Sequence, residues 1–486
     1  MRLNSRGEKR KRPGLTSEEK RDRSILRLGY GVVFGFLCLM LYMWYFLTVQ
    51  REDVINNPYN ARLERLSERV ERGALLCSDG TVLARTQTDE EGRETRVYPY
   101  GSLFDHVVGY SSRGRTGLES LANFYLLSSH INLVSQAVTE LSGRKNPGDS
   151  VVTTLDRELQ QTAGDALGDR KGAVVVMEPD TGKILALVSK PGFDPNLIES
   201  DWETLVSEDD GQARLLNRAF QGLYPPGSVF KMVIALEYIR EHPDDYDRFR
   251  FECDGYFEWG DYTIQCYHGN AHGSQDLFEA FANSCNGAFA AMGLDMNLES
   301  LGGTTQQLKF NGEQPLPLPY SQSRFAMEAG AGDWEILQTS IGQGLTQVTP
   351  MHIALITSAA ANRGALMTPY LMDYVENRAG DVVKSFQPRE WGNLMTEEEA
   401  GILGEMMRRV VTEGTGSALR TENYTAAGKT GSAQFETGKE SHAWFTGFAP
   451  AENPELVVTV IVEEGGSGGL AAAPVARTIF DAYFAR

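Results

Sequence analysis

The sequence lacks a surplus of positive charge. It carries 46 Lys and Arg residues against 65 Asp and Glu residues, which gives a formal net charge of −19 over 486 residues. A nucleic-acid partner needs a basic face that neutralises phosphates, so this balance argues against one. Internal repeats and low-complexity tracts are also absent, and hydrophobic residues make up 41% of the chain. The sequence therefore indicates an ordinary globular protein, long enough for two folded domains or more.

Charged residues are absent from one long segment, Leu28–Val49, which is 22 residues long. At about 1.5 Å per residue a helix of this length spans a bilayer core, and the bordering charges disfavour a buried soluble helix. Residues 1–27 hold ten Lys or Arg and four Asp or Glu. The positive-inside rule then places 1–27 in the cytoplasm and everything after Gln50 outside. The flank has no small-x-small cleavage pattern, so we expect residues 28–49 to be an uncleaved signal anchor.

The rest of the chain predicts a small, mostly β region over residues 50–150 and an α/β (α+β) domain over residues 151–486. Five segments of the second region have the composition of strands: Gly172–Met177, Lys183–Ser189, Thr425–Gln434, Ala443–Phe448 and Glu455–Glu463. Two strands, then helices, then three strands and a closing helix predict one five-stranded antiparallel sheet packed between helices.

Three short motifs stand in one order within residues 151–486: Ser228-Val229-Phe230-Lys231, Ser284-Cys285-Asn286 and Lys429-Thr430-Gly431. Together they form the S-x-x-K, S-x-N and K-T-G set of serine enzymes that act on peptides ending in D-alanine and on β-lactams. S-x-x-K alone carries little weight, because it also occurs at Ser17–Lys20 and Ser142–Lys145. The ordered set is what predicts a serine acyl-transfer site.

The first motif supplies a nucleophile and a base. Proline and glycine directly before Ser228 place it at a helix N-terminus. Free backbone N–H groups and the helix dipole there favour the negative charge that develops on the serine and on its tetrahedral adduct. Lys231, three residues on, lies on the same helix face. Burial lowers a lysine pKa, so a neutral Lys231 can take the serine proton. An exposed Ser and Lys on a surface helix is the alternative, which we accept for the copies at Ser17 and Ser142.

The other two motifs supply groups that bind substrate and relay protons. Ser284 can pass a proton between Lys231 and the leaving amine, and Asn286 can hold a substrate amide, although alone this tripeptide would indicate a helix cap. The ammonium of Lys429 can bind the terminal carboxylate of a peptide. Gly431 lets the substrate lie close to the strand.

With these residues the chain resembles class B penicillin-binding proteins, the monofunctional D,D-transpeptidases of bacterial cell-wall synthesis. The similarity extends to Asn217-Arg218-Ala219, Tyr224-Pro225-Pro226-Gly227, Gly342-Gln343-Gly344, Thr349-Pro350, Gly414-Thr415-Gly416, and Arg72-Gly73 with Asp79-Gly80. The resemblance implies a pedestal (dimerisation-like) domain at 50–150 and a β-lactamase-like serine D,D-transpeptidase domain at 151–486.

The resemblance also implies a role for each motif residue. Ser228 would be the acyl-enzyme nucleophile, Lys231 the base and Ser284 the proton relay. The backbone N–H groups of Ser228 and Ser432 would form the oxyanion hole. The implied substrate-binding residues are Asn286, Lys429, Thr430, Gly431 and Ser432, and the chemistry needs no cofactor.

Partners and rival functions follow from the same comparison. Class A relatives carry a glycosyltransferase domain after the membrane helix, and residues 50–150 are too few for it. By family analogy, a SEDS-type membrane glycosyltransferase would polymerise the glycan. A D,D-carboxypeptidase or β-lactamase is one alternative, but the Glu-x-Glu-Leu-Asn run that class A β-lactamases use for deacylation does not follow Asn286. A non-catalytic β-lactam sensor or scaffold is another, although residues 1–27 hardly make a signalling domain.

Three of the five cysteines stand near the motifs in sequence. Cys253, Cys266 and Cys285 with His272 supply the ligand types of a closed, structural zinc site, and the resemblance includes a metal site here in some elongation-type transpeptidases. Sporulation-type relatives instead imply a Cys266–Cys285 disulfide, which an oxidising exterior permits. Buried free thiols, with His268 and His272 as surface loop residues, are the third alternative.

Overall fold

The computed structural model describes residues 16–46, 67–207, 211–436 and 438–486. The chain divides into two compact units, Met1–Asn60 and Ala61–Arg486. The first contains α1 (Ser17–Tyr45), whose segment Ser24–Tyr45 is long and apolar enough to cross a membrane and has no buried side chains. The helix begins before the predicted anchor of 28–49, because the Glu, Lys and Arg residues before Leu28 also favour helix. Residues 47–49 lie outside the described ranges.

The larger unit is built on the five-stranded antiparallel sheet that the sequence predicts. Its strand order is β17-β18-β19-β7-β8, and each neighbouring pair is antiparallel. The strands are β7 (Gly172–Met177), β8 (Ile184–Lys190), β17 (Ala427–Ala433), β18 (His442–Ala449) and β19 (Leu456–Val462). β17 forms one edge of the sheet, so within the described part of the chain no strand pairs with the outer side of its backbone.

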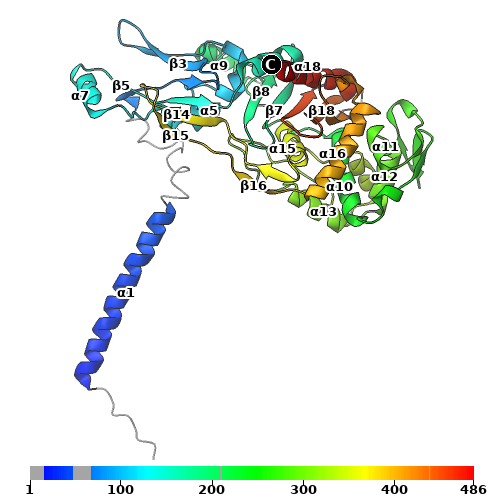
Figure 1. Ribbon diagram of the computed structural model, residues 1–486, viewed down its shortest axis with the longest axis horizontal. Coiled ribbons are helices and arrows are strands. Elements are labelled where there is room, and N and C mark those ends of the chain that lie inside the picture. The colour runs from blue at the N-terminus through cyan, green and yellow to red at the C-terminus, as the bar shows by residue number, and fades with distance from the viewer. Residues whose placement is uncertain (1–15, 47–66, 208–210, 437) are drawn as a thin grey trace, which may run out of the picture. The chain divides into compact units, whose positions relative to one another are not determined.

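Helices cover both faces of this sheet (Figure 1). One face packs against α8 (Arg157–Leu167) and α18 (Ala473–Phe484), and the other against α15 (Pro350–Ala361) and α16 (Glu397–Thr412). The alternation of side chains along β7 explains the two layers. Val174 points into the apolar cluster under α8 and α18, whereas Val175 points into the cluster that contains α15.

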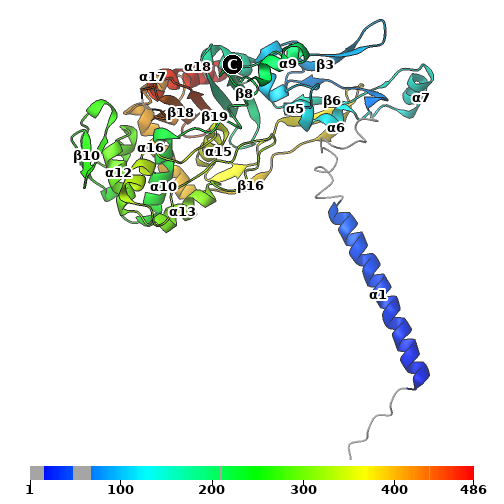
Figure 2. The ribbon, with the colours of Figure 1, turned by 180° about the vertical axis from the view of Figure 1, so that it is seen from behind.

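A second, six-stranded sheet has the order β15-β14-β6-β2-β3-β4. Its strands β3 and β6 are labelled in Figure 2. Its strands are β2 (Leu75–Leu76), β3 (Val82–Thr88), β4 (Glu94–Val97), β6 (Ser150–Thr153), β14 (Met372–Glu376) and β15 (Val382–Ser385). Two of these strands therefore come from a segment far along the chain, paired through β6 and β14. The pairing within this sheet could not be predicted from the sequence, because short strands carry no signal that identifies a distant partner strand.

The remaining elements connect and flank the two sheets. The helices are α4 (Asp105–Val108), α5 (Gly117–Leu121), α6 (Asn123–Leu126), α7 (Leu133–Leu141), α9 (Ile198–Val206), α10 (Lys231–Glu241), α11 (Leu277–Ala282), α12 (Asn286–Asp295), α13 (Leu298–Gln307), α14 (Asp333–Ser340) and α17 (Gly468–Ala471). The strands are β1 (Val70–Glu71), β5 (Asn146–Pro147), β9 (Phe251–Cys253), β10 (Tyr256–Trp259), β11 (Tyr262–Gln265), β12 (Gly273–Gln275), β13 (Ala365–Met367) and β16 (Glu390–Asn393).

Candidate active site

Ser228 lies at the start of a helix, as the sequence predicts. The 3-10 turn η5 (Gly227–Phe230) carries it and runs directly into α10. Gly227 has a φ of 54°, and a Cβ atom at this position would lie 2.8 Å from the carbonyl oxygen of Ser432 in β17. Glycine therefore lets the turn that carries Ser228 approach the edge strand of the main sheet.

Lys231 is fully buried at the beginning of α10. Its Nζ donates to the carbonyl oxygen of Ser284 at 2.7 Å and to Oδ1 of Asn286 at 2.7 Å, and lies 3.3 Å from Oγ of Ser284. Burial lowers the pKa of Lys231 to about 8, although the nearby thiols of Cys285 and Cys266 oppose the shift. The amine therefore has a neutral fraction at physiological pH, which a general base requires.

Ser284 occupies the tight turn between α11 and α12. Its φ is 55°, a left-handed backbone conformation that residues other than glycine rarely adopt. The turn brings the Ser284 hydroxyl between two lysines. Nζ of Lys429 donates to Oγ of Ser284 at 2.9 Å, and Nζ of Lys231 donates to the same oxygen at 3.3 Å. Such strain persists only where the surrounding structure holds it, and it is common at functional sites.

Lys429 lies in β17 and is also fully buried. Its Nζ donates to Oγ of Ser284 and to the carbonyl oxygen of Thr430, the latter at 3.0 Å. Burial, and then the charge of Lys231, lower the pKa of Lys429 well below its usual value. The amine stands against Ser284, so the direct contact with a substrate carboxylate that the sequence suggests stays a prediction.

One cleft of about 750 Å³ joins these groups. The predicted residues that line it are Ser228, Ser284, Asn286, Thr430, Gly431 and Ser432. Lys231 and Lys429 bond to Ser284 from below the surface. The structure thus brings all eight predicted catalytic and substrate-binding residues together. The other S-x-x-K copies lie elsewhere, because Ser142 is exposed after α7 and Ser17 begins α1.

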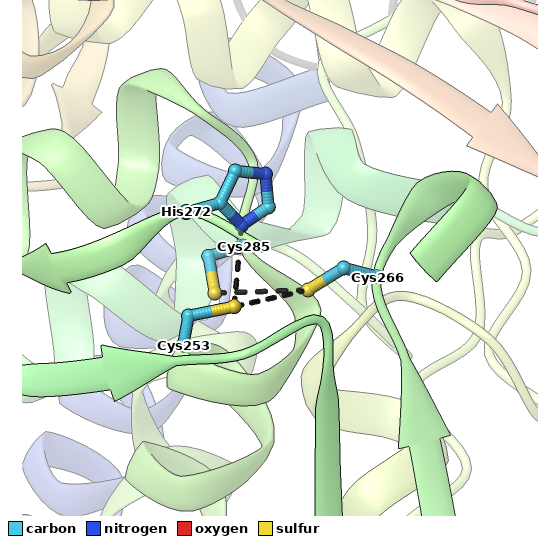
Figure 3. A group of neighbouring side chains, drawn as sticks. All are labelled: Cys253, Cys266, His272 and Cys285. Atoms are coloured by element: carbon cyan, nitrogen blue, oxygen red, sulfur yellow. Dashed lines mark hydrogen bonds between the residues drawn. The ribbon is translucent and has the colours of Figure 1, made fainter. Parts of the chain in front are cut away.

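The four predicted metal ligands also gather in one place (Figure 3). Sγ of Cys253 lies 3.7 Å from Sγ of Cys266 and 3.3 Å from Nδ1 of His272. Sγ of Cys266 lies 3.8 Å from Sγ of Cys285. All four ligand atoms are within 4.8 Å of one another. Cys285 caps α12 through a bond from the amide N–H of Ala288, so the cluster holds the turn that carries Ser284 and Asn286.

The cluster decides between some of the alternatives for the cysteines. All five cysteines lie within the described residues and are free thiols, so the Cys266–Cys285 disulfide is not formed. His272 points into the group of thiols, whereas His268 is exposed and lines the cleft. A hydrogen bond with Cys285, supported by His272 and by backbone amides, lowers the pKa of the Cys266 thiol. Cys266 therefore has the thiolate character that a metal site uses, whereas the same bond and burial raise the pKa of the Cys285 thiol.

Comparison with known proteins agrees with this geometry. The family model described as "Penicillin binding protein transpeptidase domain" matches residues 172–481, and "Penicillin binding protein A dimerisation domain" matches residues 72–151. The chain belongs to the penicillin-binding protein transpeptidase family. This confirms the resemblance that the motifs indicate, and the chemistry of this family needs no cofactor.

Individual members of the family cover nearly the whole chain. The peptidoglycan D,D-transpeptidase PbpA of Mycolicibacterium smegmatis is 31% identical, over 87% of this chain and 90% of its own length. The D,D-transpeptidase domain of a peptidoglycan glycosyltransferase from Eggerthella lenta is 32% identical with a TM-score of 0.76, covering 86% of this chain and 99% of that one. Penicillin-binding protein A from M. tuberculosis, solved as an imipenem acyl-enzyme, is 29% identical with a TM-score of 0.78, covering 87% and 99%.

Two residues of this transpeptidase-family site had no role in the sequence analysis. Oγ1 of Thr415 lies 2.6 Å from Oγ1 of Thr430 and thereby orients it. In the sequence, Thr415 is marked only by its position in Gly414-Thr415-Gly416, one of the segments that resemble class B penicillin-binding proteins. The carbonyl oxygen of Gln265 accepts a bond from Nδ2 of Asn286 at 2.9 Å. Gln265 reaches the cleft on the β10–β11 hairpin, and nothing in its local sequence predicts that contact.

Proposed function

We propose that this protein is a peptidoglycan D,D-transpeptidase that cross-links stem peptides through a Ser228 acyl-enzyme and is inhibited by β-lactams. The observation that carries the proposal is the convergence of Ser228, Lys231, Ser284 and Lys429 on one cleft beside the edge strand β17. Relatives named peptidoglycan D,D-transpeptidase and a β-lactam acyl-enzyme of a related structure support it.

In the first half-reaction, Oγ of Ser228 attacks the carbonyl carbon of the penultimate D-alanine. Lys231, as a neutral amine, accepts the hydroxyl proton. The tetrahedral oxygen receives hydrogen bonds from the backbone N–H groups of Ser228 and Ser432, which the approach at Gly227 brings together. The bond to the terminal D-alanine then breaks, and Ser284 relays the proton to its departing amine. An ester at Ser228 remains.

In the second half-reaction, the amine of a neighbouring stem peptide attacks that ester. Its proton passes back through the same groups to Ser228, whose hydroxyl is regenerated as the new amide bond forms. The donor peptide lies along β17, because a free strand edge offers backbone hydrogen bonds to an extended peptide. Asn286 holds a backbone amide of the donor, and the hydroxyls of Thr430 and Ser432 bind its terminal carboxylate within the field of Lys429.

The reaction distinguishes this function from its hydrolytic rival. The full chain in detergent, given a stem peptide ending in D-Ala-D-Ala and a second stem with a free amine, is expected to release one D-alanine for each cross-linked product. Mass spectrometry measures both. Release of D-alanine without cross-linked product across a set of acceptors would instead indicate a carboxypeptidase, and neither product would contradict the acyl-transfer function.

The rate of acylation is expected to depend on pH through Lys231. Its pKa of about 8 means that the amine is protonated, and unable to accept a proton, below that pH. The second-order rate constant with a fluorescent penicillin should therefore rise about tenfold per pH unit at low pH and level off above pH 8. Stopped-flow measurement across that range, with circular dichroism as a check on folding, tests this. A flat profile would contradict Lys231 as the base.

The domain division and membrane topology belong to the same proposal. Residues 1–27 form the cytoplasmic tail, residues 28–49 form the anchor, and the catalytic unit lies on the extracytoplasmic side. The six-stranded sheet forms the core of the pedestal, which thus includes residues 372–385 in addition to those before residue 154. A SEDS-type membrane glycosyltransferase is the proposed partner that supplies glycan, since this chain has no room for a polymerase between anchor and transpeptidase.

A structural zinc ion suits the cluster of Cys253, Cys266, His272 and Cys285. Four ligands at a Zn–S distance of about 2.3 Å place neighbouring sulfurs about 3.8 Å apart in a tetrahedron. The two sulfur–sulfur distances of 3.7 and 3.8 Å match that edge. The three cysteines are buried, and four protein ligands leave no open position, so such an ion would stabilise the fold and take no part in the reaction.

The zinc proposal predicts a loss of both metal and stability on changing one ligand. Full-length protein purified without chelator is expected to contain one zinc per chain by elemental analysis. Loss of an outer-shell partner typically weakens metal binding by about 10–100-fold, and His272→Ala, which removes a ligand, should weaken zinc binding by more than that. It should also lower the melting temperature and the acylation rate together, because metal binding and folding are linked. His130→Ala, at an exposed position outside both the cluster and the cleft, is the matched control. Metal-free wild-type protein would refute the proposal.

A further inference from the structure

The walls of the active-site cleft are polar but hold none of the acidic or basic residues that are common elsewhere in the chain. Among the described residues that line it, none is Asp, Glu, Lys or Arg. Side-chain amides and hydroxyls take their place, including Gln265, Asn270, Gln343 and Gln434. Charged residues make up 23% of the whole chain, which has a net charge of −19. The composition of the cleft lining therefore differs from that of the rest of the protein. The lining is a surface that donates and accepts hydrogen bonds within an acidic protein.

The position of Gln434 relates it to the donor peptide. Residues two apart share one face of a strand, so Thr430 and Ser432 point the same way from β17. Gln434 lies one residue beyond the end of β17, and all three residues line the cleft. In the proposed function the terminal carboxylate lies at Thr430 and the reacting carbonyl at Ser432. The residues that precede D-Ala-D-Ala then continue toward Gln434, which is about 13 Å beyond Thr430 along the chain.

Among the described residues that line the cleft, none is a Lys or Arg that could pair with a free carboxylate in that part of the donor. Lys231 and Lys429 are buried against Ser284, at the other end of this path. Lys439, on the segment after β17, is already paired with Glu436 at 2.7 Å. A carboxylate bound against this exposed wall would lose part of its hydration and gain no ion pair in return, whereas a carboxamide both donates and accepts hydrogen bonds and so matches a glutamine side chain.

We propose that this cleft selects stem peptides in which the carboxylates ahead of D-Ala-D-Ala are carried as carboxamides, with Gln434 as a specificity-determining residue. The proposal rests on the transpeptidase function proposed above. It further specifies that the donor peptide carries no free carboxylate on the residues ahead of D-Ala-D-Ala, a property that the three motifs do not determine.

Two synthetic donor peptides test this selection. They end in D-Ala-D-Ala and differ only in carrying carboxamides or carboxylates on the preceding residues. With the full chain in detergent, kcat/KM for D-alanine release is expected to be at least tenfold higher for the carboxamide peptide. Equal values, or a preference for the carboxylate, would overturn the inference. If benzylpenicillin still labels Ser228 in that case, only the selectivity has failed; if it does not, the transpeptidase function has failed as well.

A charge introduced at Gln434 provides the second test. Gln434 is exposed, so a lysine there needs no burial. Gln434→Lys is expected to reduce the preference for the carboxamide peptide at least fivefold, through faster reaction of the carboxylate peptide. Gln307→Lys, exposed at the end of α13 and outside the cleft, adds the same charge and should leave the ratio unchanged. An equal change in both variants would assign the effect to net charge and refute the role of Gln434.

Discussion

Ser228→Ala is expected to remove all covalent labelling by benzylpenicillin while leaving the fold intact. The substitution deletes one hydroxyl from a half-buried position on η5, and changes of this kind alter stability by about 0.5 kcal/mol or less. Without Oγ no ester forms, so intact-protein mass spectrometry should show no mass increase with the drug. Wild-type protein should gain one penicilloyl group per chain, on the tryptic peptide that contains Ser228.

Ser142→Ala is the matched control, because Ser142 begins another S-x-x-K copy. Its side chain is exposed, and Oγ donates only to the carbonyl oxygen of Thr139 at 2.7 Å. This variant is expected to be labelled like the wild type. Label on a peptide that contains Ser142 or Ser284, or persistent label in Ser228→Ala, would show that another serine is the nucleophile.

Lys231→Met is expected to lower the acylation rate by about 10³-fold, within the about 10²–10⁴-fold range of general-base catalysis. Methionine keeps much of the length and volume of a fully buried lysine but has no amine. The bonds to Ser284 and Asn286 are also lost, so the free energy of unfolding is expected to fall by about 1–3 kcal/mol. Single-turnover kinetics at saturating β-lactam separate the chemical step from binding.

Lys429→Met is the comparison that assigns separate roles to the two buried lysines. Its amine contacts Ser284 from β17, and a carboxylate bound nearby favours the protonated, charged form of this amine, so its loss is expected to weaken β-lactam binding as well as slow acylation. Lys145→Met, from the exposed S-x-x-K copy, should change neither quantity. Identical kinetic signatures for Lys231→Met and Lys429→Met would contradict the division of roles.

The fold was predictable wherever the signal is local. A continuous apolar run such as Gly172–Met177 is typical of a strand buried on both faces, and the structure has β7 over the same residues. The capping pattern at Thr396 and Glu399 likewise marks the start of α16. The join between β6 and β14 was not predictable, because pairing between distant short strands depends on packing in the finished fold.

The candidate site divides in the same way. Motif order, the proline and glycine before Ser228, and the set of three cysteines with His272 were sufficient to choose the residues that the structure gathers. Local sequence could not show that Lys429 bonds to Ser284 beneath the cleft, since that contact joins β17 to the turn before α12.

The sequence by itself determined the family, the ordered motifs that single out Ser228 and the apolar helix near the N-terminus, because each depends on residue types at short spacing. Only the tertiary structure decided the left-handed turn at Ser284, the contact of both lysines with its hydroxyl, and the polar cleft walls around Gln265 and Gln434. Those features arise where segments far apart in the chain meet. Their geometry and their burial, which lowers the pKa of Lys231, exist only once the surrounding core has closed over them.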